Sequence, residues 1–145
     1  MLAFETNILV YAHRDFTPWH AAAFATVRVA AESPAPWAIP WPCIHEFYSV
    51  ATNPRILTPP STPDEALAQI EYWRSSPSLV LLSENEAYWP HFREILVSSR
   101  VTGGRVHDAR IAALCLAHGV RELLTADRDF TRFPTLRTRN PLIPR

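Results

Sequence analysis

The sequence contains no lysine, and it has only three glycines and two cysteines. The glycines at positions 103, 104 and 119 cannot form the glycine-rich loop with which many nucleotide-binding proteins hold phosphates. No apolar run approaches the length that crosses a bilayer, so we expect no transmembrane helix and no membrane partner. The first residues lack the basic region and apolar stretch of a secretory signal, which predicts a cytoplasmic protein.

The two cysteines, Cys43 and Cys115, do not form a metal-binding motif, because neither has a second cysteine two residues away. Each lies among apolar residues in a predicted helix, where a free thiol packs as a small hydrophobic side chain. A disulfide would be unusual in the cytoplasm. We therefore expect two inert, buried thiols.

The charges balance, with 14 cations and 14 anions, which excludes a strongly basic protein of the kind that coats nucleic acids. After Asp129 the chain carries arginines but no acidic residue, so its last segment is basic. Arginine binds phosphate oxygens in a two-pronged geometry that lysine lacks. A GC-rich genome, which favours arginine codons, is the alternative explanation for the absence of lysine.

The chain has 145 residues, of which 48% are hydrophobic, and this size and composition predict one domain spanning residues 1–145. We expect strands over residues 2–5, 37–40, 79–82, 122–125 and 136–138, and helices over residues 7–13, 18–31, 43–52, 61–74, 85–98 and 107–118. Short apolar strands that alternate with helices indicate an α/β fold with a mostly parallel sheet of four to five strands between two helical layers. Such sheets bind ligands beyond the carboxyl ends of their strands.

Acidic residues stand at strand ends or helix starts in four places: Glu5, Glu46, Asp108, and the pair Asp127 and Asp129. Taken one at a time, each has a structural explanation. Glu46 and Asp108 suit the first turns of helices, where the helix dipole favours acids, and Asp127 suits a turn. Taken together, the carboxylates can converge at one edge of the sheet. Such a cluster indicates a magnesium site, and such sites commonly act on phosphates.

Several motifs carry a resemblance to a known family. They are Glu5-Thr6-Asn7 after the first strand, Ile44-His45-Glu46-Phe47, Asp108-Ala109-Arg110-Ile111-Ala112-Ala113-Leu114, Thr125-Ala126-Asp127-Arg128-Asp129-Phe130, and Arg132-Phe133-Pro134-Thr135-Leu136. Over almost the whole chain they resemble the PIN-domain ribonucleases, and most closely the VapC-type toxins of bacterial toxin–antitoxin pairs. The resemblance implies a three-layer α/β/α PIN-like domain.

The resemblance also implies an activity, which is Mg²⁺- or Mn²⁺-dependent hydrolysis of RNA that leaves a 3′-hydroxyl and a 5′-phosphate. The catalytic residues it implies are Glu5, Glu46, Asp108 and Asp127, of which Glu5, Asp108 and Asp127, together with Asp129, would bind metal. Thr6, Asn7 and Thr125 would orient these ligands by hydrogen bonds. The family further implies a homodimer and an antitoxin partner.

One residue departs from the family pattern, because the first acid of the family is aspartate and here it is Glu5. The extra methylene moves the carboxylate by roughly 1.5 Å, while Mg²⁺ requires ligands at about 2.0–2.1 Å in near-octahedral geometry. The alternative is therefore a weakened PIN module that binds RNA or antitoxin without cleaving. An aspartyl phosphatase fits less well, because no Asp-x-Asp motif follows the first strand.

Positive and aromatic side chains are the expected contacts for RNA. We expect Arg128 and Arg132 to bind its phosphates, with Arg137 and Arg139 as further candidates. Unpaired bases could stack on Trp19, Trp37 and Trp41. The alternatives are solvated surface charges for the arginines, and core or interface positions for the tryptophans.

Overall fold

The computed structural model describes residues 1–144, and at its centre lies a sheet of five strands. The strands are β1 (Leu2–Phe4), β2 (Trp37–Pro40), β3 (Leu79–Leu82), β4 (Glu122–Leu124) and β5 (Thr138–Arg139). Their order is β3-β2-β1-β4-β5, and every neighbouring pair is parallel. The predicted α/β fold with a parallel sheet is confirmed, and the short edge strand begins two residues later than predicted.

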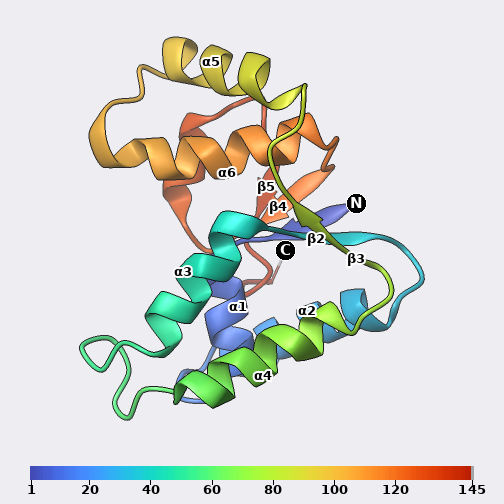
Figure 1. The fold of residues 1–145 in the computed structure, drawn as a ribbon, viewed down its shortest axis with the longest axis vertical. Helices are drawn as coiled ribbons and strands as arrows, with labels where there is room; N and C mark the ends of the chain where they lie inside the picture. The colour runs from blue at the N-terminus through green and yellow to red at the C-terminus, as the bar shows by residue number, and fades with distance from the viewer. Residues whose placement is uncertain (145) are drawn as a thin grey trace.

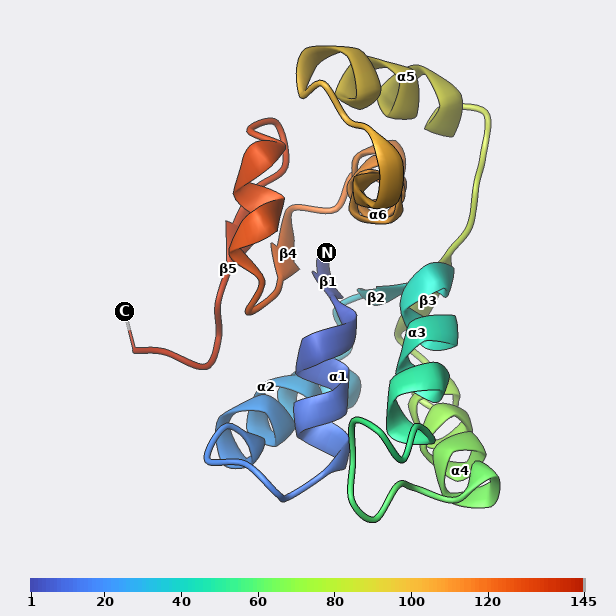
Figure 2. The same ribbon diagram turned by 90° about the vertical axis from the view of Figure 1, so that its left-hand side faces the viewer.

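Helices cover both faces of the sheet (Figures 1 and 2). They are α1 (Thr6–His13), α2 (His20–Glu32), α3 (Trp41–Ala51), α4 (Pro63–Arg74), α5 (Tyr88–Ser98) and α6 (Val106–Ala117), with short 3-10 helices η1 (Gly103–Arg105) and η2 (Arg128–Arg132). Helices α5 and α6 lie on one side of the sheet, and α1 to α4 lie on the other (Figures 1 and 2). The predicted three layers are therefore present.

Local sequence explains where several helices begin. Thr62 caps α4 by accepting a hydrogen bond from the backbone of Glu65, and the Glu65 side chain accepts one from the backbone of Thr62. Proline occupies the first turn of α4 and of α3, where the missing N–H has no intrahelical partner to lose. These are the start signals that the sequence offers for both helices.

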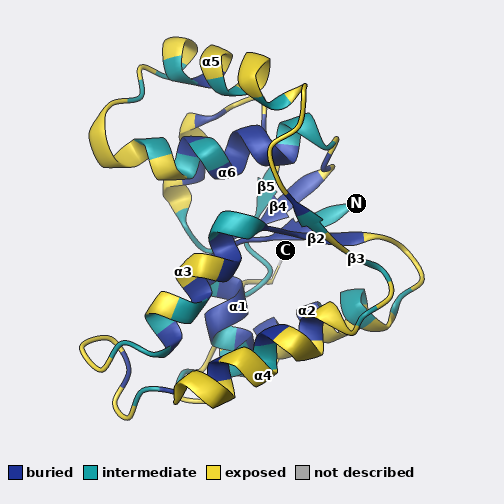
Figure 3. Cartoon of the chain, in the orientation of Figure 1, coloured by how far each residue is buried: buried dark blue, intermediate teal, exposed yellow. Residues whose placement is uncertain are grey.

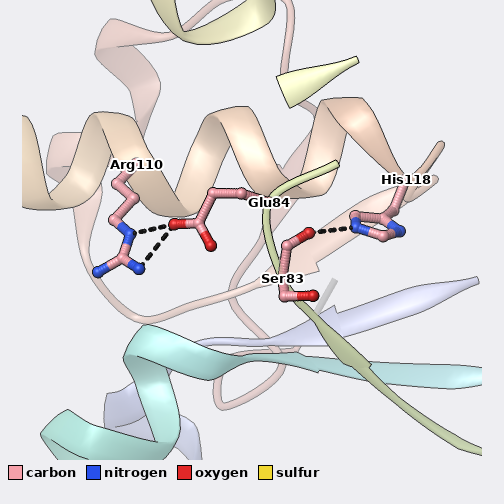
Figure 4. Close-up of polar contacts among 4 residues, drawn as sticks. All are labelled: Ser83, Glu84, Arg110 and His118. Atoms are coloured by element: carbon pink, nitrogen blue, oxygen red, sulfur yellow. Dashed lines mark hydrogen bonds and ion pairs between the residues drawn. The ribbon is translucent and has the colours of Figure 1, made fainter. Parts of the chain in front are cut away.

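Helix α5 begins at Tyr88, three residues later than predicted, because the preceding connection is tied to α6. Arg110 of α6 donates two hydrogen bonds to Glu84, at 2.9 and 2.7 Å, and the ring of His118 donates to the carbonyl oxygen of Ser83 at 2.7 Å (Figure 4). These bonds hold the chain that leaves β3 against the length of α6. A hydrogen bond from its own backbone N–H and the hydrogen bonds from Arg110 lower the pKa of Glu84.

The core lies between the sheet and its helices, where the central strands and the inner faces of the helices are buried (Figure 3). Phe4 and Trp37 pack edge to face on neighbouring strands, with ring centroids 5.7 Å apart. Trp37 is only 1% exposed, and its indole N–H donates to Ser76 at 3.0 Å. The prediction that Trp37 stacks on RNA bases is therefore wrong, because its strand is covered on both faces.

Cys43 and Cys115 are free and fully buried, as predicted, and burial raises the pKa of both thiols, that of Cys115 to about 12. Within residues 1–144, no helix is both long enough and apolar enough to cross a membrane.

Candidate active site

The carboxyl ends of the parallel strands deliver acidic residues to one cavity. Glu5 follows β1 directly, Glu46 lies on the helix after β2, and Asp127 lies three residues beyond β4. Asp108 comes from the first turn of α6. All four side chains line a cavity of about 510 Å³. The fold thus brings together acids that are as much as 122 residues apart, with Asp129 beside them.

Glu5 is the buried member of this group, with 5% of its surface exposed. It is the N-cap of α1, and its carboxylate accepts hydrogen bonds from the backbone N–H of Asn7 at 3.4 Å and from the Thr125 hydroxyl at 3.3 Å. Burial raises the pKa of Glu5 from 4.5 to about 7, and the negative charge of Glu46 adds to the rise. The hydrogen bonds act in the opposite direction.

Asn7 and Thr125 form a polar network that joins α1 to the turn after β4. The Asn7 side chain donates to Thr125 Oγ1 at 3.3 Å and accepts from the backbone N–H of Ala126 at 3.1 Å. Thr125 Oγ1 also accepts from the backbone N–H of Asp127 at 3.0 Å, while its own proton points to Glu5. One hydroxyl therefore makes three hydrogen bonds, which is its full capacity.

Three aspartates form a compact cluster, which we call the aspartate triad (Asp108, Asp127 and Asp129). One carboxylate oxygen from each lies within 4.8 Å of the other two. Burial raises the pKa of Asp108, and the charges of Asp127, Glu46 and Asp129 raise it further. Asp127 Oδ1 accepts from the backbone N–H of Asp129 at 2.8 Å, which fixes the turn between them.

The chemistry of this donor set fits a hard divalent cation. The side chains offer carboxylate oxygens and no sulfur or imidazole nitrogen within the triad, which is the preference of Mg²⁺ and Mn²⁺. Three carboxylates at this spacing repel one another unless a cation or a proton offsets their charge. The carboxylates of Glu5 and Glu46 lie outside the 4.8 Å group but line the same cavity.

Glu46 is exposed, and it is linked to the site by the hydroxyl of Thr6, which donates to its Oε2 at 3.2 Å. Thr6 itself is buried in the first turn of α1. Each of the predicted supporting residues therefore contacts a predicted catalytic residue directly: Thr6 contacts Glu46, and Asn7 and Thr125 contact Glu5.

The candidate RNA-binding arginines fall into two groups. Arg128 and Arg132 are exposed on η2, next to two members of the triad in the chain. Arg137 and Arg139 instead form ion pairs with Glu122, at 3.4 and 2.9 Å. Because Glu122 is the first residue of β4, these pairs lie at the opposite end of that strand from the acids.

The sequence offered little sign of the apolar side of the cavity. Tyr11, Phe16, Trp19 and Ile56 line it together with the carboxylates, and of these only Trp19 was a predicted contact. Phe16 and Ile56 lie in connections without periodic patterning, so their exposure could not be read from spacing. The third predicted base-stacking residue, Trp41, stacks on the ring of His45 with centroids 6.0 Å apart.

Comparisons with known proteins agree with this architecture. The family model described as PIN domain matches residues 3–136. Ribonuclease VapC43 of Mycobacterium tuberculosis is 33% identical over 142 residues, which cover 98% of this chain and 96% of that protein. Among solved structures, VapBC2 of Rickettsia felis bound to a promoter DNA fragment is 18% identical, with a TM-score of 0.70, covering 96% of this chain and 97% of the other. The sarcin-ricin loop cleaving toxin VapC20 of M. tuberculosis is 17% identical, with a TM-score of 0.65, and covers 90% of this chain and 93% of the other.

Proposed function

The chain belongs to the PIN domain family, and from this premise we propose that it is a metal-dependent endoribonuclease, the toxin of a type II toxin–antitoxin pair. The observation that carries the proposal is the aspartate triad, which lies beside Glu5 and Glu46 at the carboxyl edge of the sheet. A relative of near-equal length is named a ribonuclease. The proposal treats residues 1–145 as one catalytic domain.

Asp108, Asp127 and Asp129 would hold Mg²⁺ or Mn²⁺, with Glu5 contributing from the buried side of the cavity. When bound, the cation would supply positive charge opposite the scissile phosphate and acidify a water molecule. Glu46 is exposed and free to face substrate, while Thr6 fixes its carboxylate through a hydrogen bond. Asn7 and Thr125 hold Glu5 and the Asp127 turn in register with each other.

Hydrolysis would place the scissile phosphodiester in this cavity, with water as the nucleophile, and would leave a 3′-hydroxyl and a 5′-phosphate. Arg128 and Arg132, both exposed on η2, would bind neighbouring phosphates of the RNA. Their positive charge offsets the acidity of the cavity toward a polyanion.

The proposed partners follow from the same family membership. Solved structures with this fold include VapBC assemblies, which supports an antitoxin protein as partner for this chain. We also propose a homodimer that acts on RNA in the cytoplasm. The alternative of a non-cleaving module is less favoured, because Glu5 lines the same cavity as the aspartates and is held there by two hydrogen bonds.

The direct test is cleavage of single-stranded RNA by the purified protein with Mg²⁺, with Mn²⁺ and with a chelator. We expect cleavage with either metal, none with the chelator, and none in Asp108→Asn. An active chelated enzyme would contradict metal dependence. Cleavage by Glu5→Asp alone, with an inactive natural chain, would establish the non-cleaving module instead.

A further inference from the structure

Large apolar side chains line the proposed active-site cavity next to its carboxylates, and they remain open to solvent. Phe16 is 52% exposed, Trp19 is 42% exposed, and Ile56 is 55% exposed on another connection. Single exposed hydrophobic residues are common on protein surfaces, whereas a group of them in one concavity marks a binding surface. This group shares its cavity with the proposed catalytic acids.

Phe16 is held in place although it is exposed. The guanidinium of Arg14 lies 5.9 Å from the centroid of its ring, within the range of a cation–π contact. Arg14 is fixed in turn by hydrogen bonds to Ser61 Oγ at 3.1 Å and to the carbonyl oxygen of Pro59 at 2.6 Å. The ring is therefore presented by an anchored neighbour, which reduces the entropy that a ligand would otherwise lose by ordering it.

Trp19 is also presented by a well-bonded segment. Its backbone N–H donates to Thr17 Oγ1 at 3.2 Å, and its carbonyl oxygen accepts from Ala23 in the first turns of α2. The next residue, His20, bonds to the carbonyl oxygen of Tyr11 at 2.8 Å. The bond from His20 fastens the start of α2 to α1, which also lines the cavity.

We propose that Phe16 and Trp19 form a base-binding subsite, the aromatic shelf, which stacks an unpaired nucleobase next to the phosphate that is cleaved. This inference rests on the proposed ribonuclease function and deepens it by naming the side chains that bind a base of the RNA. A phosphate placed at the carboxylates brings its attached nucleosides into the same cavity. Aromatic faces accept any base, since every base has a π-face.

The shelf would discriminate by pairing state more than by sequence. A base inside a duplex is stacked and paired, and it must leave the helix at a cost before it can reach a cavity wall. For a base in a loop or a single strand, the free energy needed to reach the cavity is smaller, because the base is already unpaired. The protein is therefore expected to prefer loops and single strands, with a base preference weaker than its preference for unpaired nucleotides.

The test compares steady-state cleavage of one single-stranded RNA, whose cleavage position is first mapped with the natural protein. The variants are Trp19→Ala, the conservative Trp19→Phe, and the matched control Trp89→Ala, whose indole is 60% exposed on α5 outside the cavity. We expect Trp19→Ala to raise KM roughly five- to hundredfold. Trp19→Phe should recover most of this loss, and Trp89→Ala should leave KM unchanged.

A second arm keeps the natural protein and alters the RNA. Abasic nucleotides are placed one at a time on either side of the cleaved bond. One position should raise KM in the natural protein, and the same change should have little further effect in Trp19→Ala, because the stacking partner is already gone. The measurement on the natural protein does not depend on the folding of any variant.

The possible failures are distinguishable. If the natural protein cleaves no RNA, the proposed function fails. If every variant cleaves with the same KM and no abasic position matters, the aromatic shelf fails while the ribonuclease stands. If Trp19→Ala retains the KM for RNA but is no longer inhibited by the cognate antitoxin, the aromatic shelf binds protein and the base-binding subsite is refuted.

Discussion

The two sides of the acidic cavity are built differently. On the buried side, the Glu5 carboxylate is 5% exposed and accepts hydrogen bonds from Asn7 and Thr125. On the open side, the aspartate triad gathers three carboxylates within 4.8 Å. The turn that carries two of them is fixed by the hydrogen bond from the Asp129 backbone N–H to the Asp127 carboxylate. The buried side is organised by the protein before any ion arrives, whereas the open side concentrates charge that a cation must neutralise.

The difference should appear first in how stability depends on pH without metal. The pKa of Glu5 is about 7 in the folded chain against an ordinary 4.5, so between these values the folded chain binds more protons than the unfolded chain. The free energy of unfolding should therefore fall as pH rises from 4.5 to 7, by ~3 kcal/mol from this group alone. The raised pKa of Asp108 acts in the same direction.

Urea denaturation with a chelator at pH 5 and pH 7.5 measures this effect. Glu5→Gln is the control, because it keeps hydrogen-bonding oxygen but cannot ionise, and its unfolding free energy should change less across the same range. Saturating Mg²⁺ should reduce the pH dependence in the natural chain. A natural chain that is equally stable at both pH values would contradict the burial of an ionisable Glu5.

On the open side, Asp129→Asn should have opposite effects with and without metal. The substitution retains the backbone hydrogen bond from residue 129 to Asp127 but removes one of three repelling charges. We expect a higher melting temperature in chelator and about tenfold weaker Mg²⁺ binding, since that is the usual scale for a disturbed ligand set. Thermal melts over a Mg²⁺ titration measure both the melting temperature without metal and the affinity for Mg²⁺. A lower melting temperature in chelator would contradict the repulsion.

The network that joins the two sides can be cut at Asn7. Asn7→Ala removes two hydrogen bonds and leaves the backbone N–H of Ala126 without its partner, which should cost about 1–2 kcal/mol of stability. Asn85→Ala is the matched control, because its amide makes one long, exposed bond of 3.5 Å to Ala117. Chemical denaturation of both variants checks the difference, and equal losses would show that the Asn7 network contributes nothing specific.

The smallest expected effect concerns the charge beside the triad. Arg128→Ala should weaken RNA binding a few-fold and reduce the slope of log affinity against log salt by about 0.7, the contribution of one contact to a single strand. Arg74→Ala on α4, which loses only a surface ion pair with Glu71, should leave both unchanged. Binding can be measured with Mg²⁺ in an Asp108→Asn background. Equal slopes for the two variants would show that Arg128 does not contact the RNA.

Much of the fold could be predicted because the local signals agree with one another. The apolar run of β3 and the Thr62–Glu65 capping box each predict the element that forms. The placement of Glu5 and Asp127 at the same edge of the sheet could be predicted, because the carboxyl ends of parallel strands share an edge. The compactness of the aspartate triad depends on how α6 packs, which no local pattern in the sequence records.

The sequence does not predict which large apolar side chains are exposed, because exposure depends on tertiary packing. Trp37 was a candidate for contact with RNA, yet strands on both sides and helices above and below enclose it. Phe16 is apolar and could have been core, yet it lies open at the cavity. Residue type alone does not separate these two cases, because the same hydrophobic side chain serves a core or a binding wall.

The single oxygen of Thr125 has a consequence for how the molecule is made. It joins Glu5 and Asn7, which a ribosome synthesises first, to residues 125–127, which emerge more than a hundred residues later. A nascent chain that ends before this threonine also lacks Asp127 and Asp129. Translation must therefore pass this point before the acidic cavity can assemble.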